Sequence, residues 1–293
     1  MNTTVLQVAS SSKIRYYIAL LKLRLTTTVV FSGTFGYLMA SGQKTDWLRV
    51  LLFAIGSFCI TGAANVINQV IEKDIDKKMR RTKDRPLPTG VLNLQEAVLF
   101  ASVLCIMGTA TLALFLNVIT AGFALLSLVL YGFVYTPLKQ INPIAVLVGA
   151  FPGALPPLIG WVAVTGKVSM EAIVLFAIQF VWQFPHFWAI AWLGDDDYRK
   201  AGLKMLPSSG KSAYTSLQMT LYTMLLVPLG LLPRYIGMTG IASAIVVTVC
   251  SLFFLWQNIR LVLENSSKAA LRIMFTSFFY LPIVQLAFLL DKS

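Results

Sequence analysis

Residues 65–90 read NVINQVIEKDIDKKMRRTKDRPLPTG and form the densest charge cluster of a chain that is otherwise mostly apolar. The stretch starts as the end of an apolar helix and continues into a polar loop. Acidic and basic side chains are mixed through it: Glu72, Asp74, Asp76 and Asp84 stand among Lys73, Lys77, Lys78, Arg80, Arg81, Lys83 and Arg85. The pattern predicts a membrane helix that emerges into a charged extramembrane loop.

One face of this stretch carries most of its carboxylate and amide groups. On a helix at 100° per residue, five polar side chains fall within an arc of roughly 100°: Asn65, Asn68, Gln69, Glu72 and Asp76. Such a face is costly beside lipid, and its oxygens suit Mg²⁺ together with an anionic ligand. The alternative interpretation is a solvated loop whose carboxylates only balance its lysines.

The composition indicates an integral membrane protein. Hydrophobic residues make up 57% of the chain, charged residues 12%, and the mean hydropathy is +0.75, far from a soluble globular composition. The net charge of +12 does not indicate nucleic-acid binding, because the basic residues lie in short loops where topology and anionic lipid explain them. The three cysteines lie in apolar runs without ligand-like spacing, so neither disulfides nor a metal site is indicated.

The apolar runs predict nine membrane spans. Residues 1–12 are expected to form a disordered tail, and residues 13–293 a single nine-helix domain. The first span ends near Ala40; its charged start is also typical of a signal peptide, but its apolar run is long and no clear cleavage site follows. The other eight runs have the length that a bilayer requires: 47–69, 96–116, 118–136, 143–161, 170–192, 214–232, 237–257 and 271–290.

Basic residues predict the orientation of these spans. With the N-terminus inside and the C-terminus outside, nineteen of the 24 Lys and Arg residues fall on the inner side, which agrees with the positive-inside rule. The long polar loops 70–95 and 193–213 then share the inner face and hold seven of the 12 acidic residues. Two facing carboxylate clusters, the second with Asp196 and Asp197, suggest a shared site for a divalent metal and diphosphate.

The sixth span holds the only histidine, His186. Together with Gln179, Gln183 and Asp197, it projects to one side if the helix continues. Polar groups at this depth usually face a bundle interior or a cavity. His186 is therefore either a structural residue bonded to a neighbouring helix or a ligand or acid–base residue that lines a cavity.

Several stretches together resemble the UbiA-type intramembrane prenyltransferases. Asn68-Gln-x-x-Glu72-x-x-x-Asp76, followed by Arg81-Thr-x-x-Arg85-Pro-Leu-Pro-x-Gly90, is similar to the first signature of that family, with Gln69 and Glu72 in place of two aspartates. This departure resembles the protohaem IX farnesyltransferase branch. Three further stretches resemble the same branch: Tyr135-Thr-Pro-Leu-Lys139, the segment 153–161, and Trp182-Gln-Phe-Pro-His186 with its continuation through 197–202 and 205–207.

The resemblance implies an all-α integral membrane protein, a bundle of nine transmembrane helices around a central cavity. It implies Mg²⁺ as the cofactor and farnesyl diphosphate and haem B as substrates. The farnesyl group would pass to the 2-vinyl group of haem B with addition of water, giving haem O and diphosphate. Pathway logic adds a haem O hydroxylase or an oxidase assembly factor as a partner. The expected location is the cell membrane, with the active site near its cytoplasmic face.

The resemblance also suggests roles for single residues. The expected catalytic and metal-binding residues of the first motif carry carboxylate or amide oxygens: Asn65, Asn68, Glu72 and Asp76. Asp196 and Asp197 are further metal candidates, although their loop departs from the D-x-x-x-D pattern of quinone-pathway members.

The substrate-binding candidates are mostly basic. Arg81 and Arg85 are assigned to diphosphate or to haem propionates, Lys200 is a further candidate, and His186 is assigned to haem iron or to proton transfer. Lys22 and Lys139 lie on the same face but are interpreted first as positive-inside anchors, so they are not counted among the site residues.

Two alternatives remain open at this point. The first is a related intramembrane prenyltransferase that acts on a quinone or chlorophyll precursor; Glu72 and the pair Pro185–His186 distinguish the haem branch from it. The second is a transporter or channel, because charged residues at helix ends also line substrate pathways. Against a transporter, residues 65–90 have a phosphate-and-metal character, and the sequence has no clear inverted repeat.

Overall fold

The computed structural model describes residues 13–42, 45–208 and 210–293, so the predicted tail 1–12 lies outside the described residues. Within these ranges the chain is helical, and its only β-type pairing is an isolated bridge between Thr239 and Lys292. Eight described helices are long and apolar enough to cross a membrane, or nine if the bent pair Lys13–Leu20 and Leu23–Ala40 forms one span. The predicted all-α membrane architecture is confirmed.

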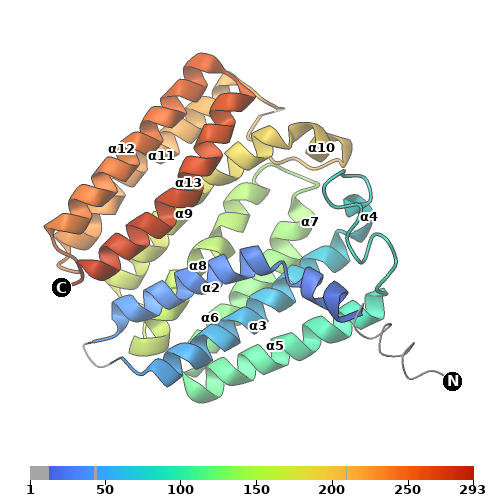
Figure 1. Ribbon diagram of the computed structural model, residues 1–293, viewed down its shortest axis with the longest axis horizontal. Coiled ribbons are helices and arrows are strands. Elements are labelled where there is room, and N and C mark those ends of the chain that lie inside the picture. Colours follow the sequence, from blue (N-terminus) through green and yellow to red (C-terminus); the bar gives the residue numbers. More distant parts are fainter. Residues whose placement is uncertain (1–12, 43–44, 209) are drawn as a thin grey trace.

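Figure 1 shows the helices as a bundle with the short loop helices at one end and the C-terminus at the other. The long helices are α2 (Leu23–Ala40), α3 (Trp47–Ile71), α5 (Leu94–Phe115), α6 (Val118–Val129) with its continuations η1 (Leu130–Tyr135) and α7 (Thr136–Leu138), α8 (Ala145–Thr165), α9 (Met170–Leu193), α11 (Ala213–Tyr235), α12 (Ile241–Glu264) and α13 (Ser267–Leu290). The loop helices are α4 (Lys73–Asp76) and α10 (Asp195–Lys200).

The last two helices differ from the predicted spans 237–257 and 271–290. The helix α12 continues to Glu264, because the Glu264 carboxylate accepts hydrogen bonds from Arg260 and Arg272. The Ser266 side chain then accepts from the Ala269 amide and starts α13 at once. A polar turn with its own ion pairs thus replaces part of the loop expected from hydropathy alone.

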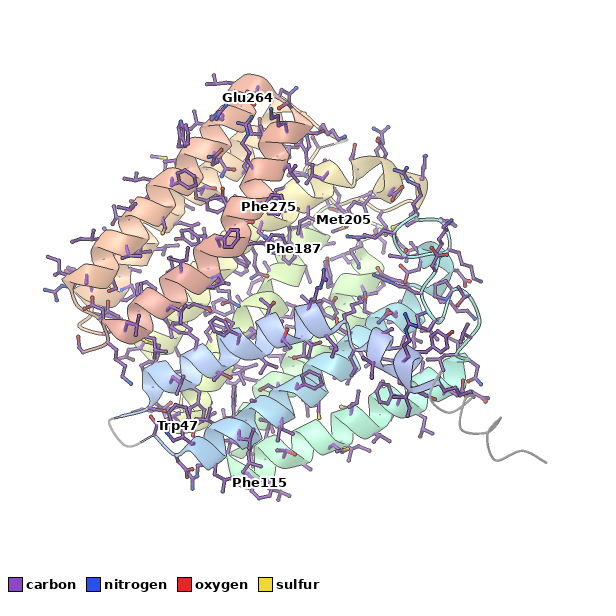
Figure 2. All side chains as sticks on the ribbon, viewed as in Figure 1. Trp47, Phe115, Phe187, Met205, Glu264 and Phe275 are labelled. Atoms are coloured by element: carbon purple, nitrogen blue, oxygen red, sulfur yellow. The ribbon has the colours of Figure 1, made fainter. Side chains whose placement is uncertain are left out.

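The bundle has two halves with separate buried apolar clusters. In one half, α3 packs against α5 and α2 against α8; in the other, α9, α11, α12 and α13 pack together, and the α8–α9 and α2–α13 contacts join the halves. Apolar side chains also cover the outer surface, as lipid requires. Trp47 and Phe115 lie at the end of the bundle away from α4 and α10 (Figure 2).

The first span bends where the polar face of α3 touches it. Its two helical segments meet at 47°, and Lys22 at the break has a φ of 49° in the left-handed region. The break frees two carbonyl groups, and α3 supplies donors to both. The Gln69 amide donates to the carbonyl of Leu20 at 2.7 Å and the Asn65 amide to that of Leu21 at 3.3 Å. These two amides of the sequence motif therefore stabilise the bend.

Prolines in α8 create a similar need for donors. Pro157 has no N–H, so the carbonyl of Gly153 loses its helical partner. The Gln179 side chain of α9 donates to that carbonyl at 2.8 Å. Its amide oxygen in turn accepts from Ser32 at 2.6 Å and from Gln285 at 3.1 Å. This buried cluster links α2, α8, α9 and α13, so Gln179 faces the bundle interior, one of the two environments expected for it, and holds helices together.

The helices α2 and α8 approach each other closely at glycine. A side-chain carbon at Gly160 would overlap the carbonyl oxygen of Gly33, which belongs to the backbone and cannot turn away. We expect Gly160→Ala to push the two helices apart and to lower the free energy of unfolding by about 1–3 kcal/mol. The midpoint of thermal unfolding in detergent measures this change.

Gly122→Ala is the matched control, because a side-chain carbon there meets nothing within 4 Å. It should leave stability unchanged or raise it by up to about 1 kcal/mol through helix propensity. Equal unfolding midpoints for the two variants would contradict the close α2–α8 contact.

Candidate active site

The two carboxylates of the first motif lie together and are buried. The helix α3 ends at Ile71, but the amide of Asp76 donates to the carbonyl of Glu72 at 2.8 Å, so the chain keeps a helical path into α4. Glu72 and Asp76 consequently face the same side, as the 100° projection predicts. Glu72 is 5% exposed and Asp76 0% exposed. Charges at such burial require partners.

Asn68 connects Glu72 to the first span. Its amide nitrogen donates to Glu72 Oε2 at 2.9 Å and to the Thr136 hydroxyl at 3.0 Å. Its oxygen accepts from Lys22 Nζ at 2.8 Å. The bend at Lys22 therefore brings an ammonium group into contact with the motif. Both ends of the Asn68 side chain are engaged, which makes it an orienting group for Glu72.

Lys139 is the direct partner of Glu72. Its ammonium nitrogen lies 2.5 Å from Glu72 Oε1 and 4.7 Å from the centre of the Tyr135 ring. The second polar loop holds it in place, because the amide of Lys204 donates to the Lys139 carbonyl at 2.8 Å. Both charged side chains are at least nine-tenths buried, so water screens their attraction weakly.

Two buried carboxylate oxygens lack an aligned hydrogen bond, one on Asp76 and one on Glu72. Asp76 Oδ2 accepts from Arg85 Nη1 at 2.8 Å, whereas Asp76 Oδ1 is buried and has no hydrogen-bond partner among the described residues. Glu72 Oε1 also lacks an aligned hydrogen bond, but the Lys139 ammonium lies 2.5 Å from it and balances its charge. Orphaned buried oxygens are costly in a finished core and normal in a site that awaits a ligand.

The charges of this cluster suit an anionic ligand with a metal ion. Three cations, Lys22, Lys139 and Arg85, surround two carboxylates, which leaves an excess of positive charge. Mg²⁺ is usually held by one or two carboxylates together with substrate phosphates, and the unpaired Asp76 Oδ1 beside the Glu72 carboxylate fits that requirement. The donor set therefore fits a magnesium diphosphate.

The two long polar loops meet at this end of the bundle (Figure 1). Arg80 Nε lies 3.2 Å from Asp197 Oδ1, and Arg81 Nη2 donates to the Tyr198 hydroxyl at 3.0 Å. A small apolar cluster lies beneath these contacts and joins the loops: Ile75, Met79, Ala201 and Leu203. The expectation that both loops share one face agrees with these contacts.

The acidic residues of the second loop do not join Glu72 and Asp76. Asp197 pairs with Arg80 instead, and Asp196 is exposed. Within the described ranges, no three His, Cys, Asp or Glu side chains are arranged to hold a metal ion. Lys200 is exposed on α10. The metal roles of Asp196 and Asp197 and the substrate role of Lys200 stay predictions.

His186 belongs to α9, in the other half of the bundle, and its side chain contacts α13. Its Nδ1 is 2.7 Å from the Ser277 hydroxyl, and that hydroxyl donates its proton to the carbonyl of Met274 at 2.7 Å. Both contacts are hydrogen bonds at once in the tautomer in which Nδ1 carries the proton and donates to Ser277, and this tautomer leaves a lone pair on Nε2. Trp182 stacks on the ring at 4.6 Å and Phe278 meets it edge-on at 5.0 Å. The ring is thus held in one orientation.

Comparison with known proteins agrees with this geometry. The model of the UbiA prenyltransferase family matches residues 29–281, most of the chain. The chain belongs to the UbiA prenyltransferase family. A protein of Cytophaga hutchinsonii named protoheme IX farnesyltransferase is 52% identical over 283 residues, which cover 96% of this chain and 99% of that protein. The prediction of a membrane prenyltransferase is confirmed, and the transporter alternative is wrong.

Solved structures show the same fold. One, described as giving insights into the biosynthesis of digeranylgeranylglyceryl phosphate synthase in membranes, superposes with a TM-score of 0.80 at 25% identity and covers 96% of this prenyltransferase and 98% of that chain. A UbiA homolog from Archaeoglobus fulgidus bound to GPP and Mg²⁺ superposes with a TM-score of 0.68 at 16% identity, covering 91% of this chain and 99% of that one.

Sequence reasoning left two residues of this UbiA-family site uncounted. Lys22 and Lys139 were interpreted as topology anchors, but each contacts the first motif directly. For Lys139 a signal was present, because the stretch that ends at Lys139 resembles the family. For Lys22 no local signal existed, since its contact depends on the bend. Asn65, by contrast, uses its amide nitrogen on the first span, so its catalytic role stays a prediction.

The Glu72–Lys139 pair of this prenyltransferase gives a stability test. Glu72→Gln leaves a buried ammonium without its counter-charge, as Lys139→Gln leaves a buried carboxylate, so each should cost about 3–5 kcal/mol of unfolding free energy. The double variant should lose clearly less unfolding free energy than the two single variants together, because it leaves no unpaired buried charge. Unfolding midpoints of the four proteins in detergent measure the coupling.

The exposed pair Asp74–Lys77, at 2.9 Å, is the control for this cycle. The Lys77 ammonium holds the pKa of the Asp74 carboxyl below its usual value, but water surrounds both groups, so Asp74→Asn and Lys77→Gln should change stability little. Additive losses at Glu72 and Lys139 would argue against a buried ion pair there.

Proposed function

We propose that this chain is a protohaem IX farnesyltransferase: it transfers the farnesyl group of farnesyl diphosphate to the 2-vinyl group of haem B, with addition of water, and releases haem O and diphosphate. The name of the relative at 52% identity over nearly the full chain supports the choice of acceptor. The observation that carries the chemistry is the buried pair of carboxylates within a surplus of cations, built from Glu72, Asp76, Lys22, Lys139 and Arg85.

The cation-rich cluster is the proposed diphosphate site. Breaking the bond between the allylic carbon and its oxygen places negative charge on the leaving diphosphate, and preorganised positive charge stabilises that charge. Lys22, Lys139 and Arg85 supply it from three separate elements. Glu72 and Asp76 would hold Mg²⁺ through their carboxylates, of which Asp76 Oδ1 has no other partner; when bound, the ion supplies further positive charge to the leaving group. The GPP and Mg²⁺ named for the Archaeoglobus homolog are consistent with this proposal.

The reaction at the vinyl group forms one carbon–carbon bond and one carbon–oxygen bond. The terminal vinyl carbon of haem B donates its π electrons to the allylic carbon and forms the new carbon–carbon bond, while the carbon–oxygen bond to diphosphate breaks. The remaining vinyl carbon becomes a cation that the macrocycle stabilises. A water oxygen then adds to it and loses one proton. The apolar bundle keeps other water from the allylic carbon while the diphosphate leaves.

His186 is the proposed residue on the acceptor side. Its Nε2 lone pair is available in the tautomer in which Nδ1 donates to Ser277. A neutral imidazole in this state can bind haem iron or accept the proton from the added water. Ser277 acts as a positioning residue, in the way that hydrogen-bond partners orient ligating histidines in other proteins.

We also propose that the protein lies in the cell membrane with this site on the cytoplasmic face and the C-terminus outside. Support comes from the basic residues, of which nineteen out of 24 fall on one side. Haem O would pass to a hydroxylase or an oxidase assembly factor, which is the expected partner at the pathway level.

The reaction can be tested with purified protein in detergent. Given haem B, farnesyl diphosphate and Mg²⁺, the wild type should form haem O, detected by mass spectrometry. Chelation of the metal should stop the reaction and added Mg²⁺ should restore it. Glu72→Gln should lower the rate about 100-fold or more, because it removes a carboxylate that would hold the Mg²⁺ at the leaving diphosphate, when assayed at a temperature at which the variant is folded.

Asp74→Asn makes the same kind of change on the exposed side of the same stretch and should keep wild-type rates. If the wild type prenylates an aromatic acid or a quinone precursor and forms no haem O, the acceptor assignment is wrong while the prenyltransferase fold stands.

The acceptor side has its own test. His186→Ala should abolish haem O formation and change the Soret band of bound haem, while farnesyl diphosphate binding persists. Ser277→Ala should lower the rate about tenfold, in the range seen when a partner of a ligating histidine is lost. Ser277→Thr keeps the hydroxyl and should keep most of the rate. Farnesyl transfer at the wild-type rate by His186→Ala would rule out the proposed role of this residue.

A further inference from the structure

A cavity of about 250 Å³ lies where the polar loops meet the ends of α9 and α13. Four apolar side chains line it, Met79 from the first loop, Ile190 and Leu193 from α9, and Met274 from α13, and the polar groups of Arg81 and Tyr198 lie beside them. The cavity belongs to the same end of the bundle as the Glu72 cluster, but neither Glu72 nor Asp76 lines it. It therefore offers a second binding region next to the diphosphate site.

His186 does not line this cavity, but a lining residue of α9 lies close to it along the helix. Ile190 is one helical turn from His186 on α9, a rise of about 6 Å. On the facing helix, the carbonyl of Met274 accepts the Ser277 hydroxyl proton, and Ser277 in turn contacts His186. A molecule in the cavity would therefore lie about one helical turn from His186.

The two motif arginines, Arg81 and Arg85, point to different places. Arg85 is half-buried and bound to Asp76 within the Glu72 cluster. Arg81 lies at the cavity, where Tyr198 engages one of its five N–H donors. We propose that the cavity receives the propionate edge of the haem acceptor and that Arg81 binds a propionate carboxylate, whereas Arg85 serves the diphosphate. This assignment rests on the proposed function.

The residues that line the cavity are suited to the propionate edge of haem. An apolar wall with one arginine suits a carboxylate attached to a large apolar ring, because the guanidinium fork matches a carboxylate. Asp197 also lines the cavity, but Arg80 neutralises it at 3.2 Å. The two methionines are flexible and polarisable and pack well against aromatic faces. The volume is below that of pockets that enclose a whole drug-sized ligand, which fits one edge of a macrocycle.

The test compares haem B with its dimethyl ester, in which both propionates are neutral. With wild type, the ester should bind about tenfold more weakly in a Soret-band titration and have a correspondingly higher KM, the loss of one charge-assisted pair. Arg81→Gln should bind haem B about tenfold more weakly, treat haem B and the ester alike, and keep the wild-type KM for farnesyl diphosphate. Arg81→Lys, which keeps the charge without the fork, should fall between.

Two matched variants complete the experiment. Arg85→Gln should impair farnesyl diphosphate binding and still distinguish haem B from its ester. Lys83→Gln removes an exposed charge from the same loop, outside the cavity lining, and should behave like wild type. If Arg81→Gln still distinguishes acid from ester, or weakens farnesyl diphosphate binding instead, the assignment of Arg81 is overturned. If wild type binds haem B without forming haem O, the proposed function is wrong. The Soret-band titrations of haem B and its ester then still test whether Arg81 binds a propionate.

Discussion

A lysine ammonium and a glutamate carboxylate meet within the low-dielectric end of the bundle, and the site depends on that contact. Lys139 and Glu72 come from helices far apart in the sequence, and each would be expensive to bury alone. Asn68 then fixes the second Glu72 oxygen and brings in Lys22. Three spans are thereby drawn to one point. The geometry of the diphosphate site follows from satisfying these buried charges before any substrate is present.

Polar side chains inside the bundle form two groups: amides that donate to open main-chain carbonyls, and carboxylates of the candidate active site. Asn65, Gln69 and Gln179 donate to carbonyls that a helix break or a proline leaves open, so their amides restore the main-chain hydrogen bonding that lipid cannot supply. The carboxylates of Glu72 and Asp76 are different, because each keeps a buried oxygen without a hydrogen bond. The bend at Lys22 brings an ammonium group to Asn68, which in turn binds the Glu72 carboxylate. Structural and chemical roles are thus adjacent along a single face of α3.

Much of the fold and part of the site could be predicted from sequence. Spans follow from hydropathy because a bilayer fixes their length, and Glu72 and Asp76 share a face because the helical period fixes their direction. Partnerships between distant segments could not be predicted in this way. Lys22 reaches Asn68 only through a bend at a residue with φ of 49°, and Asp197 is taken by Arg80 rather than joining a metal cluster. Those outcomes depend on tertiary contacts that no local pattern records.

The helix α8 carries adjacent prolines through the middle of a membrane bundle, where an open carbonyl has no water to bind. It remains a helix because Gln179 of α9 donates to the carbonyl that Pro157 leaves free. Positions 157 and 179 are therefore under a joint constraint. An amino acid with an N–H at 157 would release position 179 from its need for a donor, and loss of the amide at 179 would make proline at 157 a liability. Evolution is expected to change the two positions together, so that their identities covary among relatives.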